Sequence, residues 1–215
     1  MQYFINGTSY SFSTTLSAAN DITSITNAAP PVMTASVMPA DKSVILLKSG
    51  WGELNEQATF SGQNGELAGL DTTDPVYFPV GESAGSYQVA GGFTSLVQVR
   101  EVKDSGGDTN DFKWGYIDDS SNRQRSKPTD KNPLSLTFTM DYDADLPWFN
   151  ALVKLDRSRQ IVVMRETLPN KDVLLYSGFM AFNNNPSRTR NENMTVSAVM
   201  TINSQILRFP ASFFA

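Results

Sequence analysis

The feature that most constrains the fold is a strict alternation of apolar and polar side chains over two segments. Residues 134–142 read LSLTFTMDY, with an apolar side chain at every second position. Residues 194–203 read MTVSAVMTIN and place Thr and Ser opposite an apolar face. A period of two is typical of a β-strand with one face on a core and the other toward water. The two segments therefore predict a mainly β protein.

Other parts of the chain extend this prediction. The run Leu168–Asp172 has turn chemistry, so residues 160–182 are expected to form a hairpin. Residues 104–111 and 118–132 are polar and predicted to be loops. The further predicted strands are Val32–Val37, Val44–Lys48, Val76–Val80, Phe93–Lys103, Phe112–Ile117, Gln160–Glu166 and Val173–Phe182.

One segment departs from the period of two and predicts an amphipathic helix over about 145–156. Asp145 is expected to be the N-cap, and Pro147 suits the first turn. The apolar stripe comprises Trp148, Phe149, Leu152 and Leu155. We therefore expect a β-sandwich or barrel-like fold with one flanking helix, in a single domain over residues 1–215.

Residues 50–92 differ in kind from the rest of the chain. They hold 9 of the 14 glycines and six acidic residues, with no Lys or Arg. Long segments without regular structure are uncommon inside compact domains. Two interpretations stay open: a long loop that becomes ordered only against a partner chain, or an irregular meander of the chain's own fold. The first 30 residues are treated as an N-terminal arm of open role.

Composition excludes most catalytic classes. The chain has no Cys and no His, which removes thiol nucleophiles, His-based acid–base catalysis and most zinc sites. The run Asp141–Asp145 resembles half a calcium loop but has Leu146 and Leu152 where Gly and Glu are required. We expect no enzyme activity, no catalytic residue, no metal and no cofactor.

Charge and hydropathy limit the classes of partner that the chain can bind. The net charge is −5, and no surplus of Lys and Arg gathers in one segment, so a grip on nucleic acid through its phosphates is not expected. No apolar run reaches the roughly 18 residues that a membrane helix needs. The Thr- and Ser-rich strand faces carry almost no Lys or Glu. Such a face suits either the solvated outside of a β-sandwich or the wall of a water-filled lumen.

The order of these elements resembles the tail tube protein of long-tailed, non-contractile bacteriophages, over about residues 93–210. The similarity is one of order and patterning. The elements that carry it are the strand 134–142, the helix 145–155 with its Trp-Phe pair, the hairpin 160–182, the SRTR run at 187–190 and the strand 194–203 closing near 206–209.

The resemblance implies a structural virion protein, made in the host cytoplasm and located in the tail. Six copies would form a ring, and stacked rings a hollow, negatively lined tube. The tube would first hold the tape-measure protein and later pass DNA during ejection, and it would meet tail terminator and tip proteins at its ends. The long loop that reaches between neighbours in the family is matched to residues 50–92. Because the chain ends at Ala215 directly after the last strand, we expect no C-terminal immunoglobulin-like domain.

Two sets of residues follow from this resemblance as hypotheses. The first set lines the lumen and comprises Thr137, Thr139, Asp141, Thr195, Ser197, Thr201 and Asn203. The second set makes contacts between rings or subunits and comprises Trp51, Leu54, Phe60, Tyr77, Phe213 and Phe214. The alternative function is a β-sandwich binding module, for virion decoration or carbohydrate adhesion, whose ligand would meet an aromatic patch of Trp51, Trp114 and Tyr116.

Overall fold

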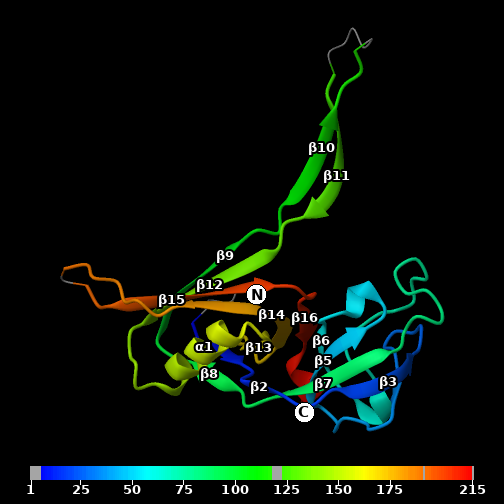
Figure 1. The fold of residues 1–215 in the computed structure, drawn as a ribbon, viewed down its shortest axis with the longest axis horizontal. Coiled ribbons are helices and arrows are strands. Elements are labelled where there is room, and N and C mark those ends of the chain that lie inside the picture. Colours follow the sequence, from blue (N-terminus) through cyan, green and yellow to red (C-terminus); the bar gives the residue numbers. More distant parts are fainter. Residues whose placement is uncertain (1–5, 118–122, 191, 215) are drawn as a thin grey trace.

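The computed structural model describes residues 6–117, 123–190 and 192–214. It contains two β-sheets that lie side by side and a two-stranded hairpin that projects away from both (Figure 1). Within the described residues there is one α-helix, and the rest of the regular structure is strand with three short 3-10 turns. The mainly β fold class with one flanking helix is thus confirmed.

The first sheet has eight strands, which come from distant parts of the chain. Every pairing in it is antiparallel. In spatial order its strands are β8 (Thr94–Leu96), β1 (Ser9–Phe12), β13 (Ile161–Thr167), β14 (Val173–Asn183), β15 (Thr195–Ile202), β12 (Leu134–Asp141) and β9 (Val99–Ser105), while β16 (Leu207–Phe209) pairs with the start of β14.

This first sheet curls around its own core. Tyr10 on β1 and Phe138 on β12 are separated by three intervening strands, yet their ring centroids lie 5.2 Å apart in an edge-to-face contact. Such a contact requires the two ends of the sheet to bend toward each other. The predicted hairpin over residues 160–182 is present as β13 and β14, whose turn is closed by the Leu168 N–H bonded to the Asp172 carbonyl.

The second sheet, with the loops that connect its strands, forms a lobe over residues 15–91. Its main strands, in spatial order, are β4 (Met33–Ala35), β3 (Asn20–Ile25), β7 (Gly85–Gly91), β5 (Val44–Ser49) and β6 (Ala58–Phe60), and β2 (Thr15–Leu16) pairs with the end of β7. The 3-10 turns η1 (Gly52–Leu54) and η2 (Gln63–Gly65) flank β6. Residues 50–92 are therefore a folded part of the lobe.

The projecting hairpin, here called the arm (residues 109–131), joins β9 to β12. Its strands are β10 (Thr109–Trp114) and β11 (Arg125–Lys131), paired antiparallel. Nearly every described residue of both strands is exposed. The prediction of loops at 104–111 and 118–132 was wrong in this region, since cross-strand pairing orders polar residues whose pattern carries no apolar period. Residues 118–122 lie outside the described residues.

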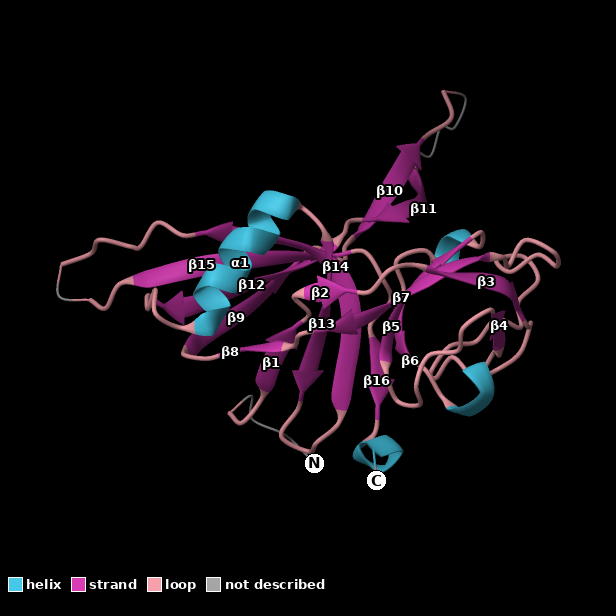
Figure 2. Cartoon of the chain, turned by 60° about the horizontal axis from the view of Figure 1, so that its bottom comes forward, coloured by secondary structure: helices cyan, strands magenta, loops and turns pink. Residues whose placement is uncertain are grey.

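The helix α1 (Pro147–Ser158) lies across the curled side of the first sheet (Figure 2). Trp148, Leu152 and Leu155 face the sheet and are buried, as the stripe predicts. The expected N-cap at Asp145 was wrong: Leu146 holds that position without a side-chain bond, and Asp145 donates its N–H to Asp143 instead. Pro147 at the first helical position supplies the fixed φ that starts the helix.

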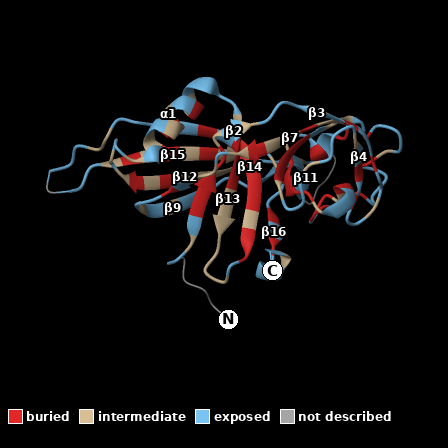
Figure 3. Cartoon of the chain, turned by 90° about the horizontal axis from the view of Figure 1, so that it is seen from below, coloured by how far each residue is buried: buried red, intermediate tan, exposed pale blue. Residues whose placement is uncertain are grey.

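Two hydrophobic cores result, and one of them joins the two sheets. The first core lies between α1 and the curled sheet. The second lies inside the lobe but includes Val163, Val173 and Leu175 from the first sheet and Leu207 and Phe209 from β16. Figure 3 shows buried segments running from one sheet to the other. A shared core means that the lobe and the first sheet bury surface against each other.

The N-terminal residues connect the two sheets. β1 inserts between β8 and β13, and Phe12 is completely buried in the first core. The Ser13 N–H bonds to the Val163 carbonyl, and the Val163 N–H bonds to the Ser13 hydroxyl. β3 then enters the lobe. The first 30 residues, whose role the sequence leaves open, thus contribute the three strands β1, β2 and β3 from residue 9 onward, and residues 1–5 lie outside the described residues.

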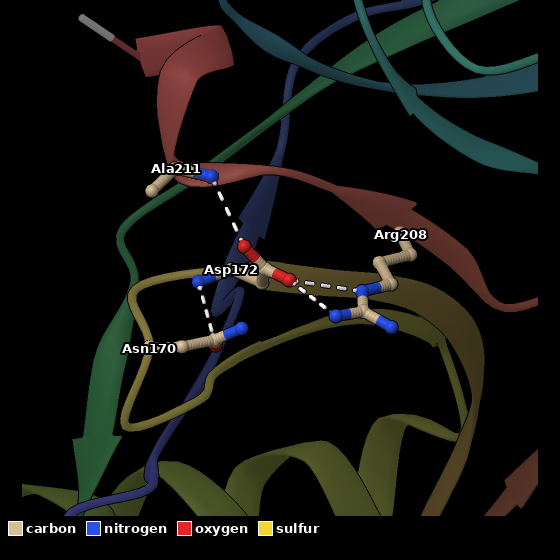
Figure 4. A network of polar contacts seen from close by, with 4 residues as sticks. All are labelled: Asn170, Asp172, Arg208 and Ala211. Carbon is tan, nitrogen blue, oxygen red and sulfur yellow. Dashed lines mark hydrogen bonds and ion pairs between the residues drawn. The ribbon is translucent and has the colours of Figure 1, made fainter. Parts of the chain in front are cut away.

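The C-terminal strand is fastened by a polar network shown in Figure 4. Arg208 Nε donates to Asp172 Oδ2 at 3.0 Å, and the Ala211 N–H donates to Asp172 Oδ1 at 3.1 Å. The Asn170 side chain in turn accepts the N–H of Asp172 at 3.1 Å. The hydrogen bonds from Arg208 hold the pKa of Asp172 below its usual value. This network holds β16 against the β13–β14 turn.

Candidate assembly surfaces

The polar side chains of β12 and β15 lie together on one face of the first sheet. Directly opposite pairs are Thr139 with Ser197 and Asp141 with Thr195. These side chains are half-buried, whereas the residues that alternate with them are mostly buried in the first core. The alternation therefore predicts correctly which side chains point away from the core. That this face lines a lumen stays a prediction.

Two neighbouring strands widen this polar face. On β9, Glu101 lies opposite Thr139 and Lys103 opposite Thr137. On β14, Phe179 lies opposite Thr201 and Ala181 opposite Val199. The face thus spans four strands, β9-β12-β15-β14, and we call it the open face. Sequence reasoning missed the part from β9, because the pattern of the run 93–103 gives no indication that its second half pairs with β12.

Charges on the open face are paired with opposite charges. Lys103 Nζ lies 3.0 Å from Glu101 Oε2, and Arg100 Nε lies 2.5 Å from Asp141 Oδ1. These four side chains contribute two positive and two negative charges. Exposed ion pairs of this kind add little stability. Their effect here is to keep the face close to neutral.

Asn203 differs from the other residues expected in a lumen. It follows the end of β15, and its side-chain amide donates to Glu56 Oε2 at 2.9 Å. Glu56 belongs to the lobe, and its backbone carbonyl also accepts the Ser177 hydroxyl. Asn203 therefore bonds the first sheet to the lobe, at the border of the open face.

The open face ends at two strand borders that no further strand of the described residues pairs. β9 has β12 as its neighbour on one side and no strand on the other among the described residues. At the opposite border, β13 begins at Ile161 opposite Phe179, so residues 180–183 of β14 extend beyond it. In that extension the Phe182 N–H bonds to Asp156 Oδ1 of α1 at 3.1 Å. Unpaired strand edges are the usual template for pairing with another chain.

Three of the residues expected at contacts between copies lie inside the chain's own core. Trp51, Leu54 and Phe60 are 2%, 3% and 2% exposed. Trp51 also donates its Nε1–H to the Pro79 carbonyl at 2.8 Å and meets Phe78 edge-on. The sequence shows that these side chains need burial, but it does not show that the partners come from the same chain. This part of the contact hypothesis was wrong.

The remaining three contact candidates differ in exposure. Tyr77 is exposed, on the surface loop that joins η2 to β7. The C-terminal aromatics dock on their own chain: Phe213 and Phe214 lie 5.7 and 5.2 Å from the ring of Phe60. Phe214 keeps an exposed side while Phe213 is half-buried. Tyr77 and Phe214 thus remain available at the surface.

Residues 50–92 pack against their own chain within the lobe, and the segment that projects is the arm. That residues 50–92 contact a neighbouring copy stays a prediction. The arm exposes Phe112 and Tyr116. The rings of Phe112 and Trp114 are stacked, with their centroids 5.8 Å apart. The patch expected for a binding module does not form. Trp51 is buried in the lobe, whereas Trp114 and Tyr116 lie on the arm.

The titratable groups with raised pKa values lie inside the protein. Burial raises the pKa of Glu166, whose carboxylate accepts the Tyr176 hydroxyl at 3.3 Å. Burial and the nearby Glu166 charge raise the pKa of Tyr10 and of Tyr176. This cluster belongs to β1, β13 and β14 and points into the first core. This cluster of Tyr10, Glu166 and Tyr176 therefore contributes no acid or base to the open face.

Over the described part of the chain, no group of three or more Asp and Glu side chains could hold a metal ion. In the Asp141–Asp145 run, Asp143 instead accepts a backbone N–H from Asp145. None of the helices in residues 6–117, 123–190 and 192–214 has the length and apolarity to cross a bilayer.

These features define a mainly β protein with a curled sheet, one helix on the inner side of that sheet, and an open face whose border strands have no further strand partner among the described residues. The family model of the phage tail tube protein, TTP, matches residues 49–211. The chain belongs to that family, and it is accordingly a structural, non-enzymatic protein of the virion tail.

Two solved structures are similar in fold to about half of the chain. One match, from the virion of a native gene transfer agent particle, has 7% identity and a TM-score of 0.40, and covers 54% of this chain and 88% of that chain. A second, from the tail of an empty gene transfer agent particle with C6 symmetry, has 8% identity and a TM-score of 0.41, and covers 54% and 85%. No curated protein matches the chain.

Proposed function

We propose that copies of this chain join edge to edge into rings, and that the rings stack into the hollow tail tube of a non-contractile phage. The carrying observation is that, among the described residues, no further strand pairs with β9 or with residues 180–183 of β14, at the two borders of the open face. A border of one copy that pairs with the opposite border of the next is a head-to-tail contact, which closes into a ring when the rotation fits. The family resemblance implies six copies in each ring.

In this arrangement the open face lines the bore. Thr137, Thr139, Ser197 and Thr201 would present small hydroxyl side chains to the lumen, and Asp141 and Thr195 would lie near its rim. Hydroxyls hydrogen-bond to water and carry no charge that could hold a phosphate backbone. Closing the sheets across copies also removes edges that would otherwise promote aggregation.

DNA would pass through this bore without specific binding. The paired charges Glu101–Lys103 and Asp141–Arg100 leave the wall near neutral, so the negative potential comes from the net charge of −5 carried by each copy. A weakly negative surround repels phosphates instead of releasing their counterions. The tape-measure protein, before ejection, and the tail terminator and tip proteins, at the tube ends, are the further partners of this proposal.

Cross-linking tests the edge contact in a chain without native cysteine. Lys103 and Ala181 lie on the open face at its two borders, three strand spacings apart in one copy. Three spacings are roughly 14 Å, and a disulfide needs Cα atoms within about 7 Å. A chain carrying Lys103→Cys and Ala181→Cys can therefore form this disulfide only between copies.

We expect oxidation of the assembled double variant to give a ladder of covalent oligomers on a non-reducing gel. The ladder should end at the number of copies in one ring. The matched control replaces Ala181→Cys by Thr23→Cys, at an exposed position of β3 in the lobe. Negative-stain images of the concentrated wild-type protein should show rings and hollow rods. Discrete particles at every concentration, or an equal ladder in the control, would contradict the proposal.

A second experiment tests which face lines the bore. Thr137→Lys and Thr195→Lys add positive charge to the open face, and we expect them to slow DNA passage while tubes still assemble, because lysines hold phosphates. Thr23→Lys is the control with the same chemistry away from that face. Unchanged ejection kinetics in particles with the two lysines would count against a lumenal open face.

A further inference from the structure

One face of the arm is both cationic and aromatic. In the register of β10 and β11, Phe112 lies opposite Lys127 and Trp114 opposite Arg125. Residues two apart on a strand share a face, so these four side chains point the same way. The Arg125 guanidinium lies 5.1 Å from the centre of the Tyr116 ring, which puts Tyr116 on this face too. We call it the cationic face.

The other face of the arm has different chemistry. Lys113 lies opposite Ser126, and Asp111 lies opposite Pro128. No aromatic side chain belongs to this face among the described residues of the two strands. This asymmetry needs an explanation, because a ribbon exposed to water on both faces gains nothing by placing all its aromatic side chains on one of them. Phe112 nevertheless remains 62% exposed.

The lobe carries a hollow with the opposite character. The hollow is lined by two acidic side chains, Glu53 and Asp71. Leu54, Tyr77 and Phe78 supply the apolar part of the lining. The adjoining loop exposes Val76 to 79%. Residues 50–92 contain six acidic side chains and no Lys or Arg, so nothing basic in that segment neutralises the hollow.

We propose that the cationic face of the arm docks in the acidic hollow of a second copy of this chain. This rests on the proposed function, since it names the surface that the arm reaches when copies assemble. Positive side chains would meet Glu53 and Asp71, and the arm's rings would cover Tyr77 and Val76. Complementary charge of this kind sets partner choice and register.

The geometry excludes docking of the arm on its own lobe and allows it on a neighbour. The arm leaves the first sheet and points away from the body of its own chain (Figure 1). From Ser105 to Tyr116 an extended strand spans roughly 35 Å at about 3.3 Å per residue, which is about twice the radius of gyration of roughly 17 Å expected for a compact chain of 215 residues. A two-stranded ribbon of that length can reach onto a neighbouring copy.

Charge reversal tests the docking in the full-length chain. The arm variant carries Arg125→Glu and Lys127→Glu, and the lobe variant carries Glu53→Lys and Asp71→Lys. All four side chains are exposed, so we expect both variants to fold with unfolding midpoints close to that of wild type. Assembly of each alone, followed by light scattering, should weaken by at least about tenfold, because like charges would then face each other.

The decisive sample is a mixture of the two variants. Arms of the lobe variant are still basic and meet the acidic lobes of the arm variant, while the reversed arms meet the reversed lobes. Opposite charges therefore face each other wherever the two variants alternate, and assembly by alternation should return to near the wild-type level. Lys113→Glu, on the other face of the same strand, is the matched control and should assemble as wild type does.

The outcomes separate this inference from the proposed function. If wild type forms tubes and each reversal variant assembles equally well, or if the mixture assembles no better than either variant alone, arm docking in this hollow is wrong and the tube proposal stands. If the arm variant alone loses retention of double-stranded DNA while assembly is unaffected, the cationic face binds polyanions and the inference is overturned. If wild type forms no tubes at any concentration, the proposed function fails first and the docking with it.

Discussion

The burial of Trp51 decides whether residues 50–92 are folded in a single copy. Trp51 is 2% exposed, bonds through its indole N–H to the Pro79 carbonyl and packs against Phe78. Truncation to alanine removes these contacts and leaves a cavity, which costs about 3–5 kcal/mol for a buried aromatic residue. For a domain of this size each kcal/mol lowers the unfolding midpoint by about 2–4 °C, so Trp51→Ala should lower it by roughly 6–20 °C.

The assay is thermal unfolding of the dilute protein, followed by circular dichroism at a concentration where sedimentation shows single copies. Tyr77→Ala is the matched control: it removes an aromatic ring from the same segment, but this ring is 57% exposed. A surface substitution of that kind should change stability by no more than about 0.5 kcal/mol. An unfolding midpoint of Trp51→Ala equal to that of wild type would show that the lobe core forms only against a partner chain, and the reasoning would be refuted.

Three further predictions follow from buried or bonded groups. Since the folded-state pKa of Asp172 is lowered from its usual 3.8, its ionised form contributes stability above that value. Asp172→Asn should therefore be less stable than wild type at neutral pH, with a difference that shrinks as the pH falls below 3.8 in a series of melting curves. The pKa of Glu166 is raised from 4.5, so wild-type stability should fall as the pH rises from 4.5 through the raised pKa. Glu166→Gln should lack that loss in the same curves, and parallel wild-type and variant curves would contradict this. A Cβ on Gly178 would lie 1.9 Å from the carbonyl oxygen of Thr201, so Gly178→Ala should cost about 1–3 kcal/mol in urea unfolding. Gly52→Ala, where no atom lies within 4 Å of the added Cβ, is its control and should be near neutral.

The elements predicted well are those whose signal is local and repeated. The strands at 134–142 and 194–203 are present as β12 and β15, and their apolar residues are mostly buried. The hairpin and the helix were also located, because a turn sequence and an amphipathic stripe depend only on residues near in the chain. The helix starts at Pro147, close to its expected N-terminus, although the residue that caps it was wrong.

Short strands and interrupted strands were not predicted well. The run 93–103 was taken as one strand, but it divides into β8 and β9 around Gln98, which has a φ of 60°. β1 and β16 are only four and three residues long and show no period of their own. The run Val76–Val80 has β-forming residues but belongs to a surface loop. Such segments become strands, or fail to, according to which partner strand is adjacent.

The candidate assembly surfaces were predicted in part. Alternation places Thr137, Thr139 and Ser197 on a non-core face, and the structure agrees. It does not show that β9 adds a charged row to that face, nor that Asn203 bonds to Glu56 across the lobe border. Those facts depend on pairings between residues that are far apart in the chain.

The sequence by itself determined the β class, the helix, the hairpin and the identity of the two polar strand faces. All of these follow from the spacing of apolar side chains over a few residues, and the hydrophobic effect acts on that spacing wherever the segment lies. Only the tertiary structure decided that residues 50–92 fold back onto β16, where Phe60 meets Phe209 at 4.8 Å, and that residues 109–131 project instead. The physical reason is that burial requires a partner surface, and composition shows which side chains need one without showing where it lies.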